Sequence, residues 1–295
     1  MRLSRTRRAF MISFSLIMAG LLGQAAAAQT VGPQAAAPTP TVTAAPANPS
    51  ASAPSTAKPS TTKPGTAQTS AKPYTTDKRA ESTTVTKGKG RAAGPAGSLM
   101  TTGSQAVALT FDDGPDPATT PALLDLLDEQ HVKATFCLVG SNAKKFPNLV
   151  RDIVDAGHTV CNHTWNHDLK LGKKSKAQIK ADMEKTNAAI LKAAPNATIA
   201  YFRAPGGKFN AKVVQVAADL GMSSLYWKVD PRDWDHPKGE THAKHQQKVI
   251  KAVQKYTHQG SIVLSHDYAQ PDTIKAYRTL IPWLKKKYKL IALPI

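Results

Sequence analysis

Residues 106–115 read A-V-A-L-T-F-D-D-G-P, and this stretch decides the fold because an apolar run ends on two adjacent carboxylates. Residues 106–111 predict a strand buried on both faces, as in a parallel sheet. Side chains alternate along a strand. Because Asp112 and Asp113 stand at the strand end, they can diverge, so that one binds a metal and the other faces a substrate.

Four further polar clusters each follow an apolar, strand-like run. They are H-T-W-N-H at 163–167, R-A-P-G-G at 203–207, D-P-R-D-W at 230–234 and L-S-H-D at 264–267. A single pair of aspartates is common in solvated turns. Five clusters placed in this way are not explained as surface decoration, so the sequence predicts a site assembled from strand ends.

The first 28 residues have the pattern of an export signal. Four arginines precede the apolar run 9–22, and small residues at 24–29 offer a cleavage site. The run is shorter than the roughly 20 residues that span a bilayer, so we expect cleavage rather than a permanent membrane anchor. Residues 6–11 also resemble a twin-arginine motif, which leaves both the Sec and the Tat export routes open.

Residues 29–97 predict a disordered linker. The stretch is rich in Ala, Pro, Thr, Ser and Lys, and it holds ten of the 21 prolines but one aromatic residue, Tyr74. Such a composition buries too little apolar surface to offset the entropy of ordering. Glycosylation of its Thr and Ser residues is left open. Residues 98–295 then form one folded domain by length.

That domain is basic, with 27 Lys and Arg against 18 Asp and Glu, a net charge of +9. Nucleic acid is not an expected partner, because no basic motif rich in aromatic residues is present. A polyanionic cell wall suits an exported basic protein, although the charge could equally serve solubility alone. We expect a monomer that is secreted and is associated with the cell wall.

Strand and helix patterns alternate through the domain. Strands are predicted at residues 106–111, 134–139, 158–161, 200–202, 224–229, 261–265 and 290–293, and helices begin at Thr120, Ala143, Ser175 and Asn210, with others before and after Ile262. The helix that starts at Ala143 is predicted to run to Ala156, and Thr120 and Ser175 are the predicted caps of their helices. Such units build a parallel sheet, either an open one or a barrel. Because every polar cluster follows a strand, as at the mouth of a barrel, we predict an α/β fold, a distorted TIM-like (β/α)7 barrel of parallel strands.

A divalent metal is expected at Asp113, His163 and His167. One carboxylate and two imidazoles leave coordination positions for water and substrate, as catalytic zinc requires; cobalt and nickel remain open. The i, i+4 spacing places both histidines on one face if the local backbone is helical. Six other histidines lack such a setting, and we expect most of them at the surface: His131, His158, His236, His242, His245 and His258.

The remaining polar residues supply the parts of an acyl hydrolase. With the metal activating a water, Asp112 is the candidate general base, and Arg203 pairs with it to hold it ionised and oriented. His266 is the candidate general acid for the leaving group, with its pKa tuned by Asp233. The backbone N–H of Gly206 is placed to help stabilise an oxyanion.

These clusters resemble those of the polysaccharide deacetylases, carbohydrate esterase family four, over residues 104–294 and in family order. The resemblance implies a distorted seven-stranded barrel and the metal, base and acid roles given above. It also implies that Trp234 and Leu264 form the apolar slot for the acetyl methyl group. One departure stands out: Gly206 occupies the position after the proline where many members carry an aromatic residue, so one wall of the groove is lost.

The resemblance implies removal of acetyl groups from N-acetylglucosamine polymers, such as peptidoglycan or chitin-like glycans. Removal of O-acetyl groups from acetylxylan by the same residues is the alternative. A third reading, a binding protein on an inactive barrel, is disfavoured because both Asp112 and His266 are present.

Cys137 and Cys161 are the only cysteines. An even count in an exported protein favours a disulfide, and both residues lie late in predicted neighbouring strands. Strands about 4.8 Å apart suit bridged Cα atoms, which usually lie about 4.4–6.8 Å apart. Two buried free thiols are the alternative.

Overall fold

The structure is a computed structural model, and it describes residues 94–295. A parallel sheet forms the centre of this part of the chain. The predicted signal and most of the predicted linker lie outside the described residues. The strands run in the order β5–β4–β3–β2–β1–β6, and β7 pairs with the start of β1. They are β1 (Val107–Asp112), β2 (Thr135–Leu138), β3 (Thr159–Asn162), β4 (Tyr201–Phe202), β5 (Ser223–Ser224), β6 (Ile262–His266) and β7 (Leu290–Ile291).

The barrel closes irregularly between β5 and β6. The prediction of one strand over residues 224–229 is wrong, because β5 ends at Ser224 and the chain then changes partners. Leu225 donates to Phe202, and Val229 forms a parallel bridge with Val263 of β6. No continuous ladder forms across this join. The predicted class, a distorted barrel of parallel strands, is confirmed.

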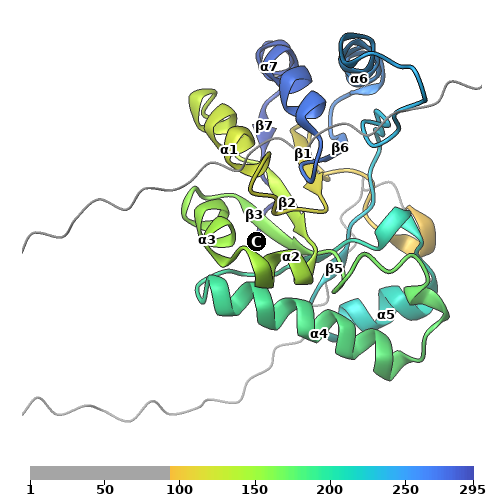
Figure 1. Ribbon diagram of the computed structural model, residues 1–295. Helices are drawn as coiled ribbons and strands as arrows, with labels where there is room; N and C mark the ends of the chain where they lie inside the picture. Colours follow the sequence, from red (N-terminus) through yellow and green to blue (C-terminus); the bar gives the residue numbers. More distant parts are fainter. Residues whose placement is uncertain (1–93) are drawn as a thin grey trace, which may run out of the picture. The chain divides into compact units, whose positions relative to one another are not determined.

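Helices surround the strands on the outside (Figure 1). Among residues 94–295, no helix has both the length and the apolar character needed to cross a membrane. The helices are α1 (Thr120–Glu129), α2 (Gly140–Lys145), α3 (Pro147–Asp155), α4 (Lys176–Ala193), α5 (Ala211–Asp219), α6 (His242–Tyr256) and α7 (Pro271–Lys285).

The single helix predicted over residues 143–156 is wrong. The structure has two helices, α2 and α3, which are separated at Phe146 with φ −125° and ψ 60°. Pro147 follows directly, and a proline disfavours helical backbone in the residue before it. The same proline suits the first turn of α3, since it has no N–H to leave unpaired.

The helix caps agree with the sequence at α4 and differ at α1. Ser175 and Gln178 form a reciprocal capping box at the start of α4. At α1 the cap position is Thr119, and Thr120, which was predicted as the cap, is already helical. The hydroxyl of Thr120 instead donates to the Asp267 carboxylate at 2.5 Å. That contact links the start of α1 to the loop that follows β6.

Alternation along the strands separates two cores. Leu109 and Phe111 of β1 belong to the large core that also includes side chains of α1, α3 and α7. Ala108, from the other face of β1, packs with Cys137 and Cys161 in a cluster drawn from several strands. This second cluster fills the barrel interior. Further along the same strands, the interior-facing side chains are polar, and they form the site described below.

The two cysteines are joined by a disulfide across β2 and β3. Cys137 and Cys161 face one another in the parallel register of these strands, with their Cα atoms 4.3 Å apart. The bridge closes a chain segment with a sequence separation of 24 and braces the strand that leads into His163. The predicted pairing is therefore present in the structure.

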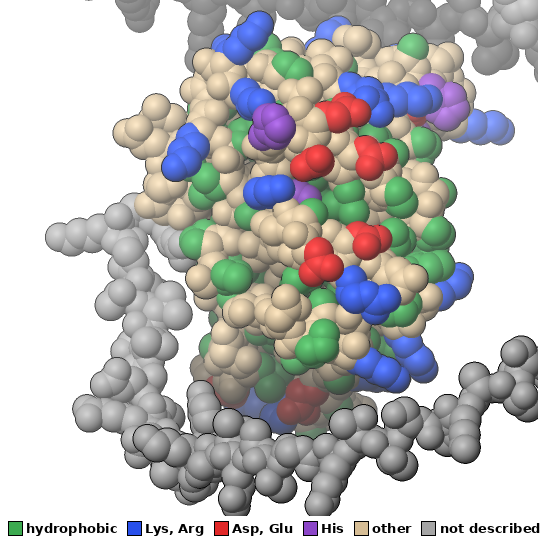
Figure 2. Space-filling view, turned by 90° about the vertical axis from the view of Figure 1, so that its left-hand side faces the viewer, with side chains coloured by type: hydrophobic (Ala, Val, Ile, Leu, Met, Phe, Trp, Pro, Cys, Tyr) green, Lys and Arg blue, Asp and Glu red, His purple; other side chains and the backbone are tan. Residues whose placement is uncertain are grey.

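Charge is mixed on the face shown in Figure 2. Acidic side chains lie across the middle of this face, with lysine and arginine side chains around them. The net positive charge of the domain is therefore not gathered there into one basic patch, as a nucleic-acid surface would require.

Candidate active site

At the carboxyl ends of four strands, the side chain that faces the barrel interior is polar. Each comes two positions after an interior position, as the two-residue period requires: Asp112 after Thr110, His163 after Cys161, Arg203 after Tyr201 and His266 after Leu264. All four are at most 9% exposed. Because parallel strands place their carboxyl ends at one end of the barrel, these side chains converge there.

Asp113, His163 and His167 come together as the sequence predicts. The Nε2 atoms of His163 and His167 lie 3.3 Å and 3.4 Å from Asp113 Oδ1. The helical backbone considered for the two histidines is absent. A turn replaces it, with positive φ at Thr164 (66°) and His167 (55°). Asp113 also has a positive φ, 75°, so it leaves the line of β1 and separates from Asp112.

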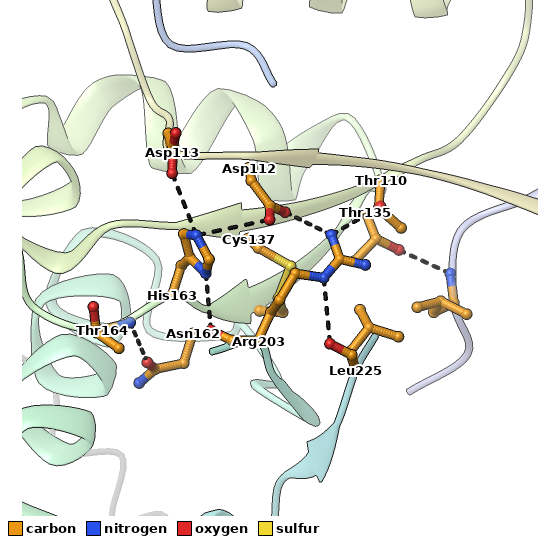
Figure 3. The surroundings of a disulfide bond; sticks show 12 residues. Thr110, Asp112, Asp113, Thr135, Cys137, Asn162, His163, Thr164, Arg203 and Leu225 are labelled. Atoms are coloured by element: carbon orange, nitrogen blue, oxygen red, sulfur yellow. Dashed lines mark hydrogen bonds and ion pairs between the residues drawn. A yellow bond between two sulfur atoms is a disulfide. The ribbon is translucent and has the colours of Figure 1, made fainter. Parts of the chain in front are cut away.

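The three side chains fit a divalent metal. His163 Nδ1 lies 2.8 Å from the carbonyl oxygen of Arg203 and must donate to it, since a carbonyl only accepts. In the neutral imidazole the lone pair is therefore on Nε2, which faces Asp113 (Figure 3). Asp113 Oδ1 is buried and has no hydrogen-bond partner. An oriented imidazole beside an unpaired carboxylate oxygen is the arrangement that a metal completes.

The electrostatics of this cluster attract a cation. Burial opposes ionisation of Asp113, but the nearby imidazole of His163, together with His266 and His167, holds the pKa of the carboxyl below its usual range. Burial likewise opposes charge on His163, but Asp112 and Asp113 outweigh it and raise the pKa of this imidazole. A proton and a metal ion therefore compete for His163 Nε2.

Asp112 is held from one side by a buried guanidinium. Arg203 Nη1 donates to Asp112 Oδ1 at 2.6 Å and to Thr110 Oγ1 at 2.9 Å. Arg203 Nη2 donates to the carbonyl of Tyr226 at 3.1 Å, and the side chain is fully buried. Asp112 Oδ2 faces the metal cluster instead, 3.7 Å from His163 Nε2. One oxygen is thus fixed, and the other is directed towards the pocket.

His266, on the strand next to the one that carries Asp112, forms a buried pair with Asp233. His266 Nδ1 lies 2.9 Å from Asp233 Oδ1, and the backbone N–H of His266 donates to Oδ2 at 2.8 Å. Thr273 at the start of α7 also donates to Oδ2, at 2.8 Å. Burial opposes charge on the imidazole, but Asp233, aided by Asp112 and Asp113, raises the pKa of His266 to about 9.

These groups line a pocket of about 390 Å³. Trp234 is 45% exposed at its edge and Leu264 is buried within it, so both predicted acetyl-slot residues reach the same pocket as Gly206. A side chain at Gly206 would meet Leu169 at 3.1 Å. Leu169, which is 46% exposed, therefore occupies the space beside the glycine where the resemblance implied a lost wall.

Several residues around the pocket have no role predicted from the sequence. Thr110 accepts a hydrogen bond from Arg203, and Thr273 donates one to Asp233. Alternation along β1 could have identified Thr110 as an interior-facing residue. Other pocket-lining residues without a predicted role are Leu169, Lys208, Trp227 and Asp230. Asp230 belongs to the D-P-R-D-W cluster, and no sequence pattern marks the other three, because they come from segments whose approach to the pocket depends on the fold.

Asp267, directly after His266, is a further buried carboxylate. A Cβ at Gly114 would lie 2.4 Å from Asp267 Oδ2, so only glycine allows the turn after Asp113 to pass here. Burial raises the pKa of Asp267 to about 7. This residue anchors the turn from behind rather than lining the pocket.

Two histidines expected at the surface are buried. His158 is 7% exposed and packs on Phe136, and His245 in α6 is 0% exposed. Most of the six are exposed, as expected. His245 also lies beside His236 and Glu240, in a group whose geometry could hold a metal ion.

Comparison with known proteins supports one family. A polysaccharide deacetylase family profile matches residues 100–225. A chitooligosaccharide deacetylase of Sinorhizobium fredii is 39% identical over 173 residues, 59% of this chain and 77% of the relative. A peptidoglycan-N-acetylglucosamine deacetylase of Bacillus cereus is 35% identical over 185 residues, 61% of this chain and 82% of the relative.

A solved structure is also similar. The family 4 carbohydrate esterase from Streptomyces lividans, in complex with acetate, superposes with a TM-score of 0.56 at 32% identity, over 64% of this chain and 91% of that chain. Fold and site thus define a hydrolase on a distorted α/β barrel. The chain belongs to the polysaccharide deacetylase family, carbohydrate esterase family 4, and it is accordingly an amidase-type enzyme.

Proposed function

We propose that the protein removes N-acetyl groups from polysaccharides that contain N-acetylglucosamine, peptidoglycan or chitin-like glycans. The observation that carries this proposal is that a candidate base and a candidate acid, on the neighbouring strands β1 and β6, both line one pocket. Asp112 is fixed by Arg203, and His266 is fixed by Asp233. The relatives named for chitooligosaccharide and peptidoglycan deacetylation support the substrate class.

In this proposal, Asp113, His163 and His167 hold a divalent metal, with zinc first and cobalt or nickel as alternatives. The ion supplies Lewis-acid polarisation, which favours attack of water on the acetyl carbonyl carbon. Asp112 Oδ2, the oxygen not bonded to Arg203, accepts a proton from the attacking water. The N–H of Gly206 is available to the carbonyl oxygen as negative charge develops there.

His266 then completes the reaction as the general acid. Its Nδ1 is engaged by Asp233, so Nε2 is the atom available to donate a proton to the departing nitrogen. An amine is a poor leaving group unless it is protonated. A buried imidazole whose pKa is raised to about 9 is therefore suited to amide substrates.

We also propose that the domain acts outside the cytoplasm, at the cell wall. The disulfide between Cys137 and Cys161 supports an oxidising compartment. The basic composition of residues 1–97, with 12 Lys and Arg against two acidic residues, is compatible with a polyanionic wall.

Acetate release from peptidoglycan, chitooligosaccharides and acetylxylan, measured side by side, tests the substrate class. The Asp112→Asn variant serves as the control for background hydrolysis. We expect release from one or both of the N-acetylated glycans. Release from acetylxylan alone would replace this proposal with O-deacetylation, and release from none would leave an inactive glycan-binding barrel.

A further inference from the structure

A second group of potential metal ligands lies away from the pocket centre, on the segment that follows Trp234. His236 and Glu240 belong to this segment, and His245 is in the first turn of α6. One ligand atom from each of the three lies within 4.8 Å of the other two. None of them lines the pocket described above.

His245 is the unusual member of the group. It is 0% exposed, and neither of its ring nitrogens has a hydrogen-bond partner. Burying an imidazole without a partner is unfavourable, because the polar atoms lose their water contacts and gain nothing in return. Such a side chain points to a ligand that the protein itself does not supply.

Each histidine has an oxygen acceptor near one of its ring nitrogens. His236 Nε2 lies 3.1 Å from Gln270 Oε1, which leaves Nδ1 for a ligand. Asp272 Oδ2 lies 3.5 Å from His245 Nδ1 without forming a hydrogen bond, and it also lies 2.7 Å from His242 Nδ1. Gln270 and Asp272 both stand at the start of α7. Metal-bound histidines are commonly oriented by such an oxygen acceptor on their second nitrogen.

Two features moderate the affinity of this group for a cation. Lys248 pairs with Glu240 Oε2 at 3.1 Å, so a bound metal would have to compete with an ammonium group. The rings of His236 and His245 lie with centroids 3.5 Å apart, closer than the 5.1 Å between His163 and His167. His236 is exposed, so its ring can shift by a small amount while Nε2 stays near Gln270, without disturbing the core.

We propose that His236, Glu240 and His245 form a second metal site, selective for borderline divalent transition metals such as zinc or nickel. Imidazole nitrogen with a single carboxylate favours these ions over magnesium or calcium. A metal here would join the segment that carries Asp233 and Trp234 to α6. The site would therefore hold one wall of the pocket in place, independently of the reaction at Asp113.

Zinc stoichiometry in a protein that lacks the first site tests this proposal. The full chain is used without a polyhistidine tag, and His163→Ala with His167→Ala removes the first set of ligands. After incubation with zinc chloride and gel filtration, bound zinc is measured by elemental analysis. We expect about one equivalent per chain, as for a site with three protein ligands. Adding His236→Ala should reduce this to less than about a tenth.

Matched variants separate the site from general surface binding. His258→Ala, another exposed histidine, should leave the equivalent in place, and Gln270→Ala should weaken zinc binding about tenfold or more by removing an outer partner. His245→Asn should act like His236→Ala, with circular dichroism confirming that the protein is folded. The proposal is wrong if the double variant holds no zinc, or if it keeps its zinc when His236 is replaced.

The outcome is distinguishable from a failure of the first site. If Asp113, His163 and His167 bind nothing, the wild-type protein would hold one equivalent that His163→Ala leaves unchanged and His236→Ala removes. If only the first site binds, the wild-type protein would hold one equivalent that His163→Ala removes and His236→Ala leaves unchanged.

Discussion

The pocket has a metal side, formed by Asp113, His163 and His167, and a proton side, formed by His266 and Asp233. The two sides differ in whether their polar atoms already have partners within the protein. On the metal side, Asp113 Oδ1 is buried without a partner, and His163 keeps a lone pair directed towards it. On the proton side, both oxygens of Asp233 are bonded, one to His266 Nδ1 and the other to Thr273 and the His266 amide. A group that receives an ion from solution leaves acceptors open, whereas a group that moves a proton has its partners built in.

The backbone shows the same contrast. Asp113, Thr164 and His167 all have positive φ, a conformation that costs non-glycine residues energy and is retained where surrounding structure enforces it. His266 instead continues a regular strand, β6. Arg232, directly before Asp233, also has a positive φ of 55°, so the backbone contrast is between the three metal-side residues and His266 itself.

Removing the metal side should have the largest effect. His163→Ala eliminates a buried ligand whose orientation is set by the Arg203 carbonyl. We expect acetate release to fall to background and zinc to be lost from the first site, with the far-ultraviolet circular dichroism spectrum unchanged. Treatment with a chelator should have the same effect on the wild type. Full activity after chelation would show that the metal side is not catalytic.

Replacing the base should be nearly as severe, but through a different loss. Asp112→Asn keeps the shape of the side chain and the oxygen that faces Arg203, so metal binding at Asp113 should persist. Turnover should fall about 10²- to 10⁴-fold, the usual contribution of a positioned base. Acetate release and bound zinc are measured on the same preparation. Loss of the metal would show that the roles of Asp112 and Asp113 are exchanged.

Removing the acid should discriminate between substrates. His266→Ala leaves the metal side untouched, and an ester releases an alkoxide that needs less help from a proton than an amine does. We therefore expect deacetylation of chitooligosaccharide to fall by at least about tenfold more than hydrolysis of an activated acetyl ester. Equal losses on both substrates would assign His266 a structural role instead.

The sequence predicts the two sides of the pocket well because they depend on alternation along buried strands. The positions of their strand residues follow the two-residue period of the interior-facing strand positions, and their motifs supply the chemistry: Asp112, His163, Arg203 and His266. The disulfide follows from the same register, because Cys137 and Cys161 occupy matching positions of neighbouring strands. Short-range patterns of this kind are visible in a single sequence.

Other features depend on contacts between distant segments. Leu169 beside Gly206, the bond from Thr273 to Asp233 and the burial of His245 each join parts of the chain far apart in sequence. The break between α2 and α3 was readable from Pro147, but the apolar periodicity on both sides concealed it. The short β5 arises because the barrel closes by changes of pairing partner, and composition does not reveal these changes.

The smallest effect should come from removing the charge of Asp233, which raises the pKa of His266. In the wild type the pKa of His266 is raised to about 9 by Asp233 acting against burial, so the acid form is present at lower pH and is lost as pH rises through that value. Asp233→Asn removes the largest contribution that raises this pKa. The alkaline limb of kcat/KM should therefore move about one to three units to lower pH.

A bound divalent cation would itself lower the pKa of His266, but it would do so in both proteins, so the displacement between the two profiles remains the measured quantity. Thr273→Val is the matched control, because it deletes a neutral hydrogen bond to Asp233 without removing the charge. It should move the limb much less than Asp233→Asn does. If the limb keeps its position in Asp233→Asn, the titrating acid is not His266, and the contrast between an open metal side and a pre-paired proton side would no longer describe the chemistry of the pocket.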